Sequence, residues 1–425
     1  MAGPAPRRPT GRPIDRSAER RIVVAGILLA AGFLVAAAAS LSLPATTTRG
    51  IWLPLHLALA GAATTAIAAV MPFFAAAFAA APPADARLRA ASIAAVAAGA
   101  AIVAAGVAAP TNGVAVAGGA TFLAGVAGIA AATAAPLRGA LGPGRGLVTR
   151  AYLVALGQLG VGVLLGSLFL AGWEPMVGAW IGGRSAHAWL NLVGFVSLVI
   201  ATTLLHFFPT VAGARIGGGL SPRIAVYGLA VGPPLVAAGS LVASDVVVRA
   251  GALTVGTGAA GLTVYAVSAW RRRSRWTTDH GWHRFAMVGL AGAIAWFDIG
   301  IAIAAGRVLI LGAAPAAWST ALVVGPLVVG WVATTIVASA THLLPAVGPG
   351  GPADHARQRR LLGSVAVSRL VTLNGGVAAL TVGTALDVAW IRFGGAIAIA
   401  SALAVSVGLL AGAVVLGARR WPVAH

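Results

Sequence analysis

The residues of this sequence best suited to chemistry are histidines, and two of them, His187 and His206, stand in one apolar segment that ends at Pro209. The same segment carries an amide at Asn191. It is long enough to cross a bilayer core of roughly 30 Å, which needs about 20 helical residues. An imidazole or an amide without a partner is costly in hydrocarbon, so such side chains face protein, water or a ligand. The segment 187–209 is therefore predicted to contain a site.

His187 and His206 cannot bind the same ion, because they are 19 residues apart, which is roughly 28 Å along a helix. At the outer end, Asn191 follows His187 by one turn on the same helical face, and His56 of another apolar segment is expected at a similar depth. Imidazoles from neighbouring helices could be axial ligands of a haem or part of a copper site, each with its second ring nitrogen held by a partner. A structural role for these two histidines is an equally good interpretation, and Asn191 could cross-link helices.

The inner end of the segment provides a second level of histidines. His206 and His342 are the candidate metal ligands there, and His283 is a possible third member. A proline follows each of the first two histidines by three residues, so a role in ending the helix is an equal alternative. Histidines at helix ends often only meet water or lipid headgroups. That interface role is the one we expect for His283, His280, His355 and His425.

Few other polar side chains lie inside apolar runs. Asp298 is the one carboxylate well inside such a run, and two interpretations stay open: proton or cation handling, and an ion pair with Arg369. Gln158 and Asn374 are expected to form interhelical hydrogen bonds.

Composition excludes most soluble classes of protein. The chain of 425 residues is 59% hydrophobic and 9% charged, with a mean hydropathy of +0.94, which predicts an all-α polytopic membrane protein. The net charge is +20, and all 29 basic residues are arginines, most of them between apolar runs, so topology explains the charge better than a nucleic-acid partner does. The chain has no cysteine, which excludes disulfides, iron–sulfur clusters and haem attachment through Cys-x-x-Cys-His. It also has no Walker loop, dinucleotide fingerprint, His-Glu-x-x-His or nucleophile elbow.

The apolar runs number twelve. The first, 22–43, follows a basic stretch and is too long for a typical signal core, so it is interpreted as a retained helix. Backbone groups in lipid must bond within their own segment, which predicts that every run is helical. The other runs are 51–80, 88–109, 113–136, 149–172, 187–211, 223–243, 247–269, 283–305, 315–346, 361–385 and 389–417.

The arginines predict the orientation of these helices. If the helices alternate in direction from a cytoplasmic N-terminus, 23 arginines fall on the cytoplasmic side and five on the other, and Arg369 falls inside a helix. This positive-inside pattern predicts a multi-pass protein of the cell membrane with both termini in the cytoplasm. Residues 1–21 and 418–425 are predicted to be cytoplasmic tails, the first of them disordered.

The sixth and tenth runs share a spacing. Gly194 precedes His206 by twelve residues, and Gly330 precedes His342 by the same number. The second run matches more loosely, with His56 ahead of its glycine. This similarity predicts an internal repeat of four helices. The three repeat units of the twelve-helix membrane domain 22–417 are expected at about 22–136, 149–269 and 283–417.

Three four-helix units with histidines on the second helix of each resemble subunit I of the haem–copper oxidase superfamily. The closer resemblance is to its divergent relatives, the NnrS-like haem and copper membrane proteins and the actinobacterial membrane domains linked to copper oxidases. Their His-x-His-x-Asn-x-x-Gly signature is similar to this chain at 187–194. The residues that carry the resemblance are His187, Asn191, Gly194, His206, Pro209, Trp52, His56 and Gly61.

The resemblance implies a haem- or copper-associated role in redox chemistry, nitrogen-oxide stress or metal handling, with a copper protein or an electron donor as partner. Under it, His56, His187 and Asn191 are the cofactor-binding candidates, and His56, His187, His206 and His342 are the metal ligands. Trp189 stands where the signature has its second histidine, which argues against conventional oxygen reduction. A secondary transporter or channel and a cofactor-free relative are the alternatives, and no reaction is assigned.

Overall fold

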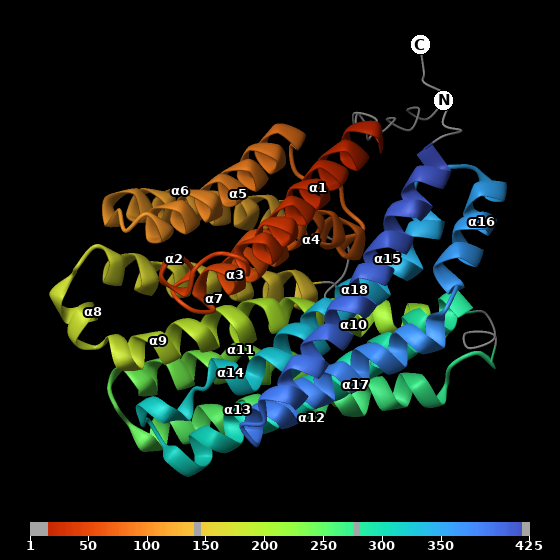
Figure 1. Cartoon of the computed structure of the whole chain (residues 1–425). Helices are drawn as coiled ribbons and strands as arrows, with labels where there is room; N and C mark the ends of the chain where they lie inside the picture. The colour runs from red at the N-terminus through yellow and green to blue at the C-terminus, as the bar shows by residue number, and fades with distance from the viewer. Residues whose placement is uncertain (1–15, 140–145, 276–280, 419–425) are drawn as a thin grey trace, which may run out of the picture. The chain divides into compact units, whose positions relative to one another are not determined.

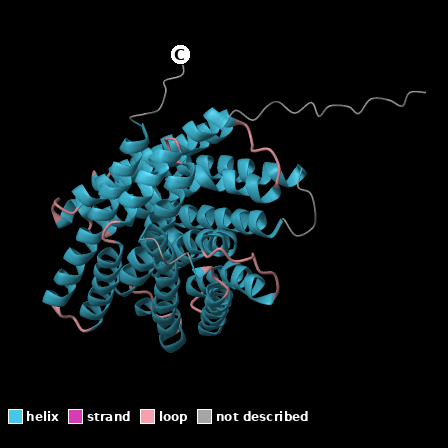
Figure 2. Ribbon diagram, turned by 90° about the vertical axis from the view of Figure 1, so that its right-hand side faces the viewer, coloured by secondary structure: helices cyan, strands magenta, loops and turns pink. Residues whose placement is uncertain are grey.

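The computed structural model describes residues 16–139, 146–275 and 281–418. These residues form helices joined by short loops, with no strand in the ranges described (Figure 2). Within these ranges, twelve helices are long and apolar enough to cross a membrane. The protein is therefore an all-α polytopic membrane protein, which confirms the prediction from composition. Most of the two predicted tails, 1–15 and 419–425, lies outside the described residues, whereas 16–21 already belong to the first helix.

The chain divides into two compact units, residues 1–156 and 157–425, with the boundary inside α7. We call them unit 1 and unit 2. The α-helices are α1 (Arg16–Ser40), α2 (Ala45–Thr48), α3 (Trp52–His56), α4 (Thr64–Ala79), α5 (Ala86–Ala108), α6 (Asn112–Ala134), α7 (Gly146–Leu170), α8 (Glu174–Gly178), α9 (Trp180–Ala188), α10 (Leu198–Val211), α11 (Leu220–Leu241), α12 (Asp245–Arg271), α13 (Gly281–Leu311), α14 (Thr320–Val323), α15 (Thr334–Val347), α16 (Pro352–Gly363), α17 (Ala366–Ala385) and α18 (Ala389–Ala418). Short 3₁₀ turns are η2 (Ala135–Gly139) and η5 (Pro315–Ala317).

Three spans are interrupted by π-helical segments. These are η1 (Leu57–Ala63) between α3 and α4, η3 (Trp189–Ser197) between α9 and α10, and η6 (Val324–Ala333) between α14 and α15. They lie in the second, sixth and tenth spans, the same spans in which the sequence places the repeat. Wide π-helical turns are rare and often mark functional positions. The same local geometry therefore recurs in these three spans, whereas the three repeat units stay a prediction.

Glycines allow close packing of consecutive helices. In unit 1, α5 and α6 lie side by side (Figure 1), and a Cβ on Gly99 would come within 2.6 Å of the Phe122 Cα atom. In unit 2, α11 and α12 form a similar pair, in which a Cβ on Gly228 would lie 2.5 Å from the Gly258 Cα atom. The pair α17 and α18 uses Gly376 in the same way. Small residues bring the backbones together where the hydrophobic effect between helices is weak.

Two predicted boundaries are wrong. The segment predicted to begin at His187 is already helical from Trp180, because the preceding turns are too polar to show in the hydropathy pattern. The segment predicted as 361–385 is divided, since α16 ends at Gly363 and α17 begins at Ala366. Val365 between them has a φ of 46°, in the left-handed region. That conformation is unfavourable for a β-branched residue and breaks the helix.

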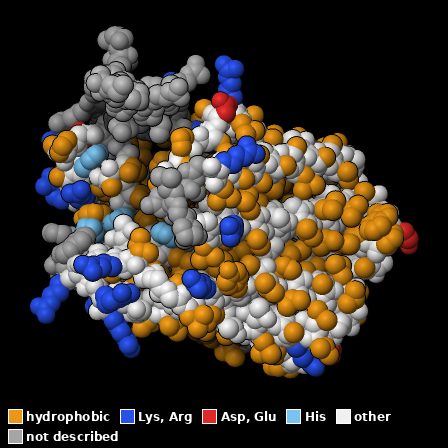
Figure 3. Space-filling model, turned by 180° about the vertical axis from the view of Figure 1, so that it is seen from behind, with side chains coloured by type: hydrophobic (Ala, Val, Ile, Leu, Met, Phe, Trp, Pro, Cys, Tyr) orange, Lys and Arg blue, Asp and Glu red, His pale blue; other side chains and the backbone are white. Residues whose placement is uncertain are grey.

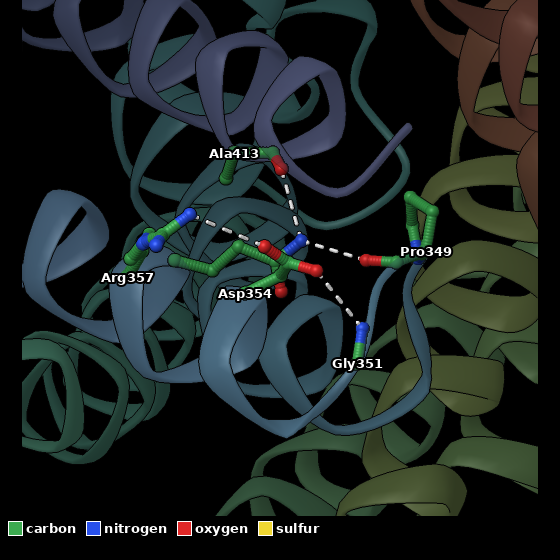
Figure 4. A network of polar contacts seen from close by, with 6 residues as sticks. Pro349, Gly351, Asp354, Arg357 and Ala413 are labelled. Carbon is green, nitrogen blue, oxygen red and sulfur yellow. Dashed lines mark hydrogen bonds and ion pairs between the residues drawn. The ribbon is translucent and has the colours of Figure 1, made fainter. Parts of the chain in front are cut away.

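Hydrogen bonds hold α16 against its neighbours. The fully buried Gln358 side chain donates through Nε2 to the carbonyl oxygens of Pro349 and Ala413, each at 2.9 Å. At the start of the helix, the Gly351 N–H donates to Oδ2 of Asp354 at 3.1 Å (Figure 4). Gln358 therefore connects α16 to both α18 and the loop that follows α15.

The surface is that of a membrane protein. Large apolar side chains such as Leu28, Val246 and Phe393 are 66%, 78% and 70% exposed, which is costly in water. Hydrophobic side chains are spread over much of the face in Figure 3.

Candidate functional site

The outer half of the histidine-bearing span packs against the glycine-rich face of α7. The Nδ1 atom of His187 lies 2.8 Å from the carbonyl oxygen of Gly162. A Cβ on Gly166 would come within 3.3 Å of the imidazole ring, and a Cβ on Gly162 would come within 2.7 Å of the Asn191 amide carbon. Glycines on α7 therefore make room for both His187 and Asn191.

The same interface continues toward the middle of the span. Gln158 lies against Gly194, where a Cβ would come within 2.7 Å of the Gln158 amide carbon. The Nε2 atom of Gln158 donates to the Ala230 carbonyl on α11 at 3.2 Å, which confirms the interhelical hydrogen bond predicted for it. Oδ1 of Asn191 and Oε1 of Gln158 are buried and accept no hydrogen bond from the described residues. The interface thus presents an imidazole and two amides in succession.

In unit 1, His56 closes α3 at the edge of η1. Its Nδ1 atom lies 2.8 Å from the carbonyl oxygen of Trp52. Its ring stacks on the Trp52 indole with centroids 4.0 Å apart and planes inclined by 22°. The indole and the carbonyl together fix the orientation of the imidazole.

The two carbonyl contacts define the tautomer of each histidine. A carbonyl oxygen only accepts hydrogen bonds, so Nδ1 of His56 and of His187 must carry the proton. In a neutral imidazole, Nε2 then holds the lone pair, which is the arrangement of a metal-ligating histidine oriented by a backbone carbonyl. His56 and His187 therefore share one orientation, with Nδ1 on a backbone carbonyl oxygen, and their role as cofactor ligands stays a prediction.

The three π-helical segments end in the same hydrogen bond. The hydroxyl of Thr64 donates to the carbonyl five residues earlier at 2.9 Å. Ser197 makes the equivalent bond at 2.8 Å, and Thr334 makes it at 3.0 Å. Each hydroxyl satisfies a carbonyl at a wide turn, where the ordinary helical ladder is interrupted.

Ser197 also links two π-helical segments of unit 2. Its Oγ atom accepts a hydrogen bond of 3.1 Å from Nε1 of Trp331 in η6. Both side chains are fully buried, and the Trp331 ring stacks on Phe297 with centroids 4.7 Å apart. The centre of unit 2 is thus a serine–tryptophan contact between the sixth and tenth spans.

An aromatic cluster surrounds His342 at the inner level. The ring of His342 lies 5.6 Å from the Trp282 ring, 5.7 Å from the His283 ring and 5.7 Å from the Phe207 ring, between centroids. His206, next to Phe207, is half-buried on α10. The guanidinium of Arg359 lies over Trp282 at 5.3 Å. The expectation that His283 only meets the membrane surface is wrong, because its side chain is buried against Trp282; His280 and His425 lie outside the described residues.

The prolines after His206 and His342 do not end their helices, which continue to Val211 and Val347. A proline has no N–H for the carbonyl four residues earlier. For Pro209 that carbonyl belongs to Leu205, and the Tyr265 hydroxyl of α12 donates to it at 2.5 Å. A neighbouring helix therefore replaces the lost hydrogen bond, so the helix persists.

Asp298 and Arg369 have separate partners, so the alternative of an ion pair between them is wrong. The Thr263 hydroxyl donates to Oδ2 of Asp298 at 2.5 Å. The Arg369 guanidinium donates to the Leu362 carbonyl at 2.5 Å and lies 3.9 Å from the centre of the Phe285 ring. Arg369 is thus a buried structural cation held by a carbonyl and an aromatic face.

The metal-ligand predictions stay predictions. Among residues 16–139, 146–275 and 281–418, no three histidine or carboxylate side chains gather to hold a metal ion. His206 and His342 lie in unit 2 with His187, and His56 lies in unit 1. No protein-family model matches the chain, and no curated protein matches it either. Fold and site together define an all-α membrane protein with polar groups inside three interrupted spans.

Several residues of these sites could not be recognised from the sequence. Threonine pairs follow the shared glycine at 64–65, 202–203 and 334–335. The pair at 202–203 therefore seemed to be the hydroxyl group equivalent to those of the other two spans, and Ser197 was not recognised. The signal that identifies it is a hydroxyl three or four residues after the shared glycine, at Thr64, Ser197 and Thr334. Trp282 stands at the end of a span, where tryptophans commonly anchor the membrane interface, but its ring packs on His342.

Proposed function

We propose that this protein is a haem- or copper-associated membrane protein of the cell membrane, with a role in electron transfer, nitrogen-oxide stress or metal handling rather than in conventional oxygen reduction. His187 and His56 are each proposed to give one nitrogen ligand. The observation that carries the proposal is their shared geometry, in which Nδ1 donates to a backbone carbonyl and Nε2 keeps the lone pair.

The donor set favours haem over a copper site built from protein ligands alone. Copper sites with imidazole ligands generally need three or more protein donors, and no such group occurs in the part of the chain that the structure describes. A haem iron needs only one or two axial side chains, because the porphyrin supplies the other four nitrogens. Single, well-oriented histidines are sufficient for it.

The residues around His187 would position such a group. The Gly162 carbonyl holds the ring by Nδ1 and raises the basicity of Nε2. The Asn191 amide, one turn further along, has a buried oxygen that accepts no hydrogen bond from the described residues. It could receive a donor from a bound group. A bound haem would supply one-electron chemistry, and a copper protein or another electron donor is the partner we propose.

The arginine pattern supports the proposed orientation, with both termini in the cytoplasm. Because 23 of the 29 arginines would then lie on the cytoplasmic side, the positive-inside rule is satisfied. His56 and His187 would lie toward the outer face, where a partner outside the cell could exchange electrons with the protein.

Purification in mild detergent from cells supplied with iron and copper tests the proposal. Absorption spectra of the oxidised and reduced protein and its iron and copper contents should reveal a bound haem or copper. His187→Ala and His56→Ala should each lower that content, whereas His355→Ala on α16 should not. His355 is a suitable control because its Nε2 atom is already in a long contact of 3.4 Å with the carbonyl oxygen of Gly348 in a loop. A colourless, metal-free protein would overturn the proposal.

A further inference from the structure

A carboxyl group lies deep inside a membrane-spanning helix of unit 2. Asp298 is the eighteenth of the 31 residues of α13, so it is at least about 18 Å from either helix end along the axis. Its Oδ2 atom accepts a hydrogen bond of 2.5 Å from the Thr263 hydroxyl on α12. Of the carboxylates in the described residues, it is the one in the interior of a candidate span.

The surroundings of this pair are apolar and open to lipid. Asp298 and Thr263 are half-buried at the edge of the interface between α12 and α13. Ala295 and Ile299 beside the carboxyl are exposed, and Val264 beside the hydroxyl is exposed as well. The pair therefore lies where the acyl chains of a bilayer would contact the protein.

Charged groups on the elements that pack against this region point elsewhere. Arg307, the nearest cation along α13, is about 13 Å away along the helix axis and donates to the Ala316 carbonyl. Arg369 of α17 is held by the Leu362 carbonyl. On α12, the Tyr265 hydroxyl donates to the Leu205 carbonyl.

The remaining ionisable groups on the neighbouring elements lie toward helix ends or on the short helix α16. They are Asp245, Arg249 and Arg271 on α12, His283 and Arg284 on α13, His206 on α10, Arg223 and Tyr227 on α11, His342 on α15, and Asp354, His355, Arg357, Arg359 and Arg360 on α16. No ion pair to Asp298 occurs within the described residues. An ionised carboxylate would therefore face hydrocarbon with one hydroxyl as its partner, which is far costlier than a neutral carboxylic acid.

We propose that Asp298 and Thr263 form a lipid-facing proton-binding site, in which Asp298 carries a proton on Oδ1 while the threonine hydroxyl donates to Oδ2. The carboxyl takes up one proton and releases one proton, and the hydroxyl stabilises the transient carboxylate. This inference does not depend on a bound haem or copper, because the pair lies on α12 and α13, helices that contain neither His187 nor His56.

A hydrophobic carbodiimide is a direct probe, because it reaches protonated carboxyls from the lipid phase. The acid proton moves to a carbodiimide nitrogen, and the carboxylate oxygen attacks the central carbon to form an O-acylisourea. That adduct rearranges to a stable N-acylurea without any further reactant. Membranes containing the full chain are treated with dicyclohexylcarbodiimide, digested and mapped by mass spectrometry.

Asp298 should be the principal labelled residue, and Asp298→Asn should lose that label. Thr263→Val should be labelled at least as fast, since removal of the donor favours the neutral acid. A water-soluble carbodiimide with an added amine should reverse the selectivity and label residues such as Asp387, whose side chain is 90% exposed. Absence of hydrophobic labelling at Asp298, or equal labelling of Asp298 by the water-soluble reagent, would overturn the proposal.

Discussion

The contact between Ser197 and Trp331 predicts a measurable coupling between two π-helical segments. Replacing Ser197 by alanine removes the acceptor for the Trp331 indole N–H, which is fully buried. A buried donor left without a partner costs about 1–3 kcal/mol. The Leu192 carbonyl also loses its hydroxyl donor, but a backbone N–H can still reach it in the helix. We therefore expect Ser197→Ala to lower the free energy of unfolding by roughly 2 kcal/mol.

A double-mutant cycle separates this hydrogen bond from packing. Trp331→Phe removes the donor without stranding a polar atom, so its cost comes from lost packing against Phe297. Once the indole N–H is absent, Ser197→Ala no longer strands it. The double variant should therefore be more stable than the sum of the single changes predicts, by roughly 1 kcal/mol, within the range measured for interhelical hydrogen bonds in membranes.

The assay is reversible unfolding of the full chain in mixed micelles, with the fraction of denaturing detergent as the variable and tryptophan fluorescence and helical circular dichroism as the readouts. All four proteins of the cycle are compared in the same micelles. Strictly additive effects would refute the assignment of a hydrogen bond between the two spans.

Three further predictions test packing with variants matched in position. Gly376→Ala should destabilise the pair of α17 and α18 by about 1–3 kcal/mol, because the new Cβ would lie 3.0 Å from the Gly395 carbonyl oxygen. In Gly375→Ala the new Cβ meets nothing within 4 Å, so this control should be neutral or mildly stabilised. A thermal melt of the two variants measures the difference. Gln358→Leu removes both hydrogen bonds that hold α16, and proteolysis should cut the loop before α16 faster than in the parent protein. Gly162→Ala should displace the Asn191 amide and lower cofactor content, whereas Gly160→Ala, which meets nothing within 4 Å, should leave it unchanged.

Each of these predictions has a clear contrary outcome. Equal melting temperatures for the two α17 variants would contradict the close packing of that helix pair. An unchanged proteolysis rate would show that α16 is held by other contacts. Equal cofactor content in the two α7 variants would show that cofactor binding does not depend on the packing of Asn191 against Gly162.

Hydropathy was sufficient to predict the spans because bilayer thickness and backbone hydrogen bonding leave few alternatives to a helix of about 20 residues. Hydropathy did not predict that a helix extends beyond its apolar run, as at Trp180, or that one residue with left-handed backbone separates two helices, as at Val365. Neither the polar turns before His187 nor the left-handed backbone after Gly363 has a hydropathy signal.

The candidate site was only partly predictable. His187, His56 and Asn191 could be identified because they are polar side chains inside apolar spans, where they need a partner or a function. The shared positions of glycine and histidine identified the related spans. The π-helical turns were not foreseen, because they depend on a hydroxyl reaching a carbonyl five residues earlier, and serine and threonine also occur throughout ordinary helices. The contacts of Trp282 and Trp331 depend on tertiary packing, which periodicity cannot encode.

The central claim is that Nε2 of His187 is a ligand, and chemical rescue tests it most directly. His187→Gly leaves a space for an imidazole beside the Gly162 carbonyl, with which the native ring now makes its 2.8 Å contact. We expect this variant to lose the haem or copper absorption of the parent protein and to regain it when free imidazole is added. A variant whose spectrum equals that of the parent before imidazole is added would contradict it.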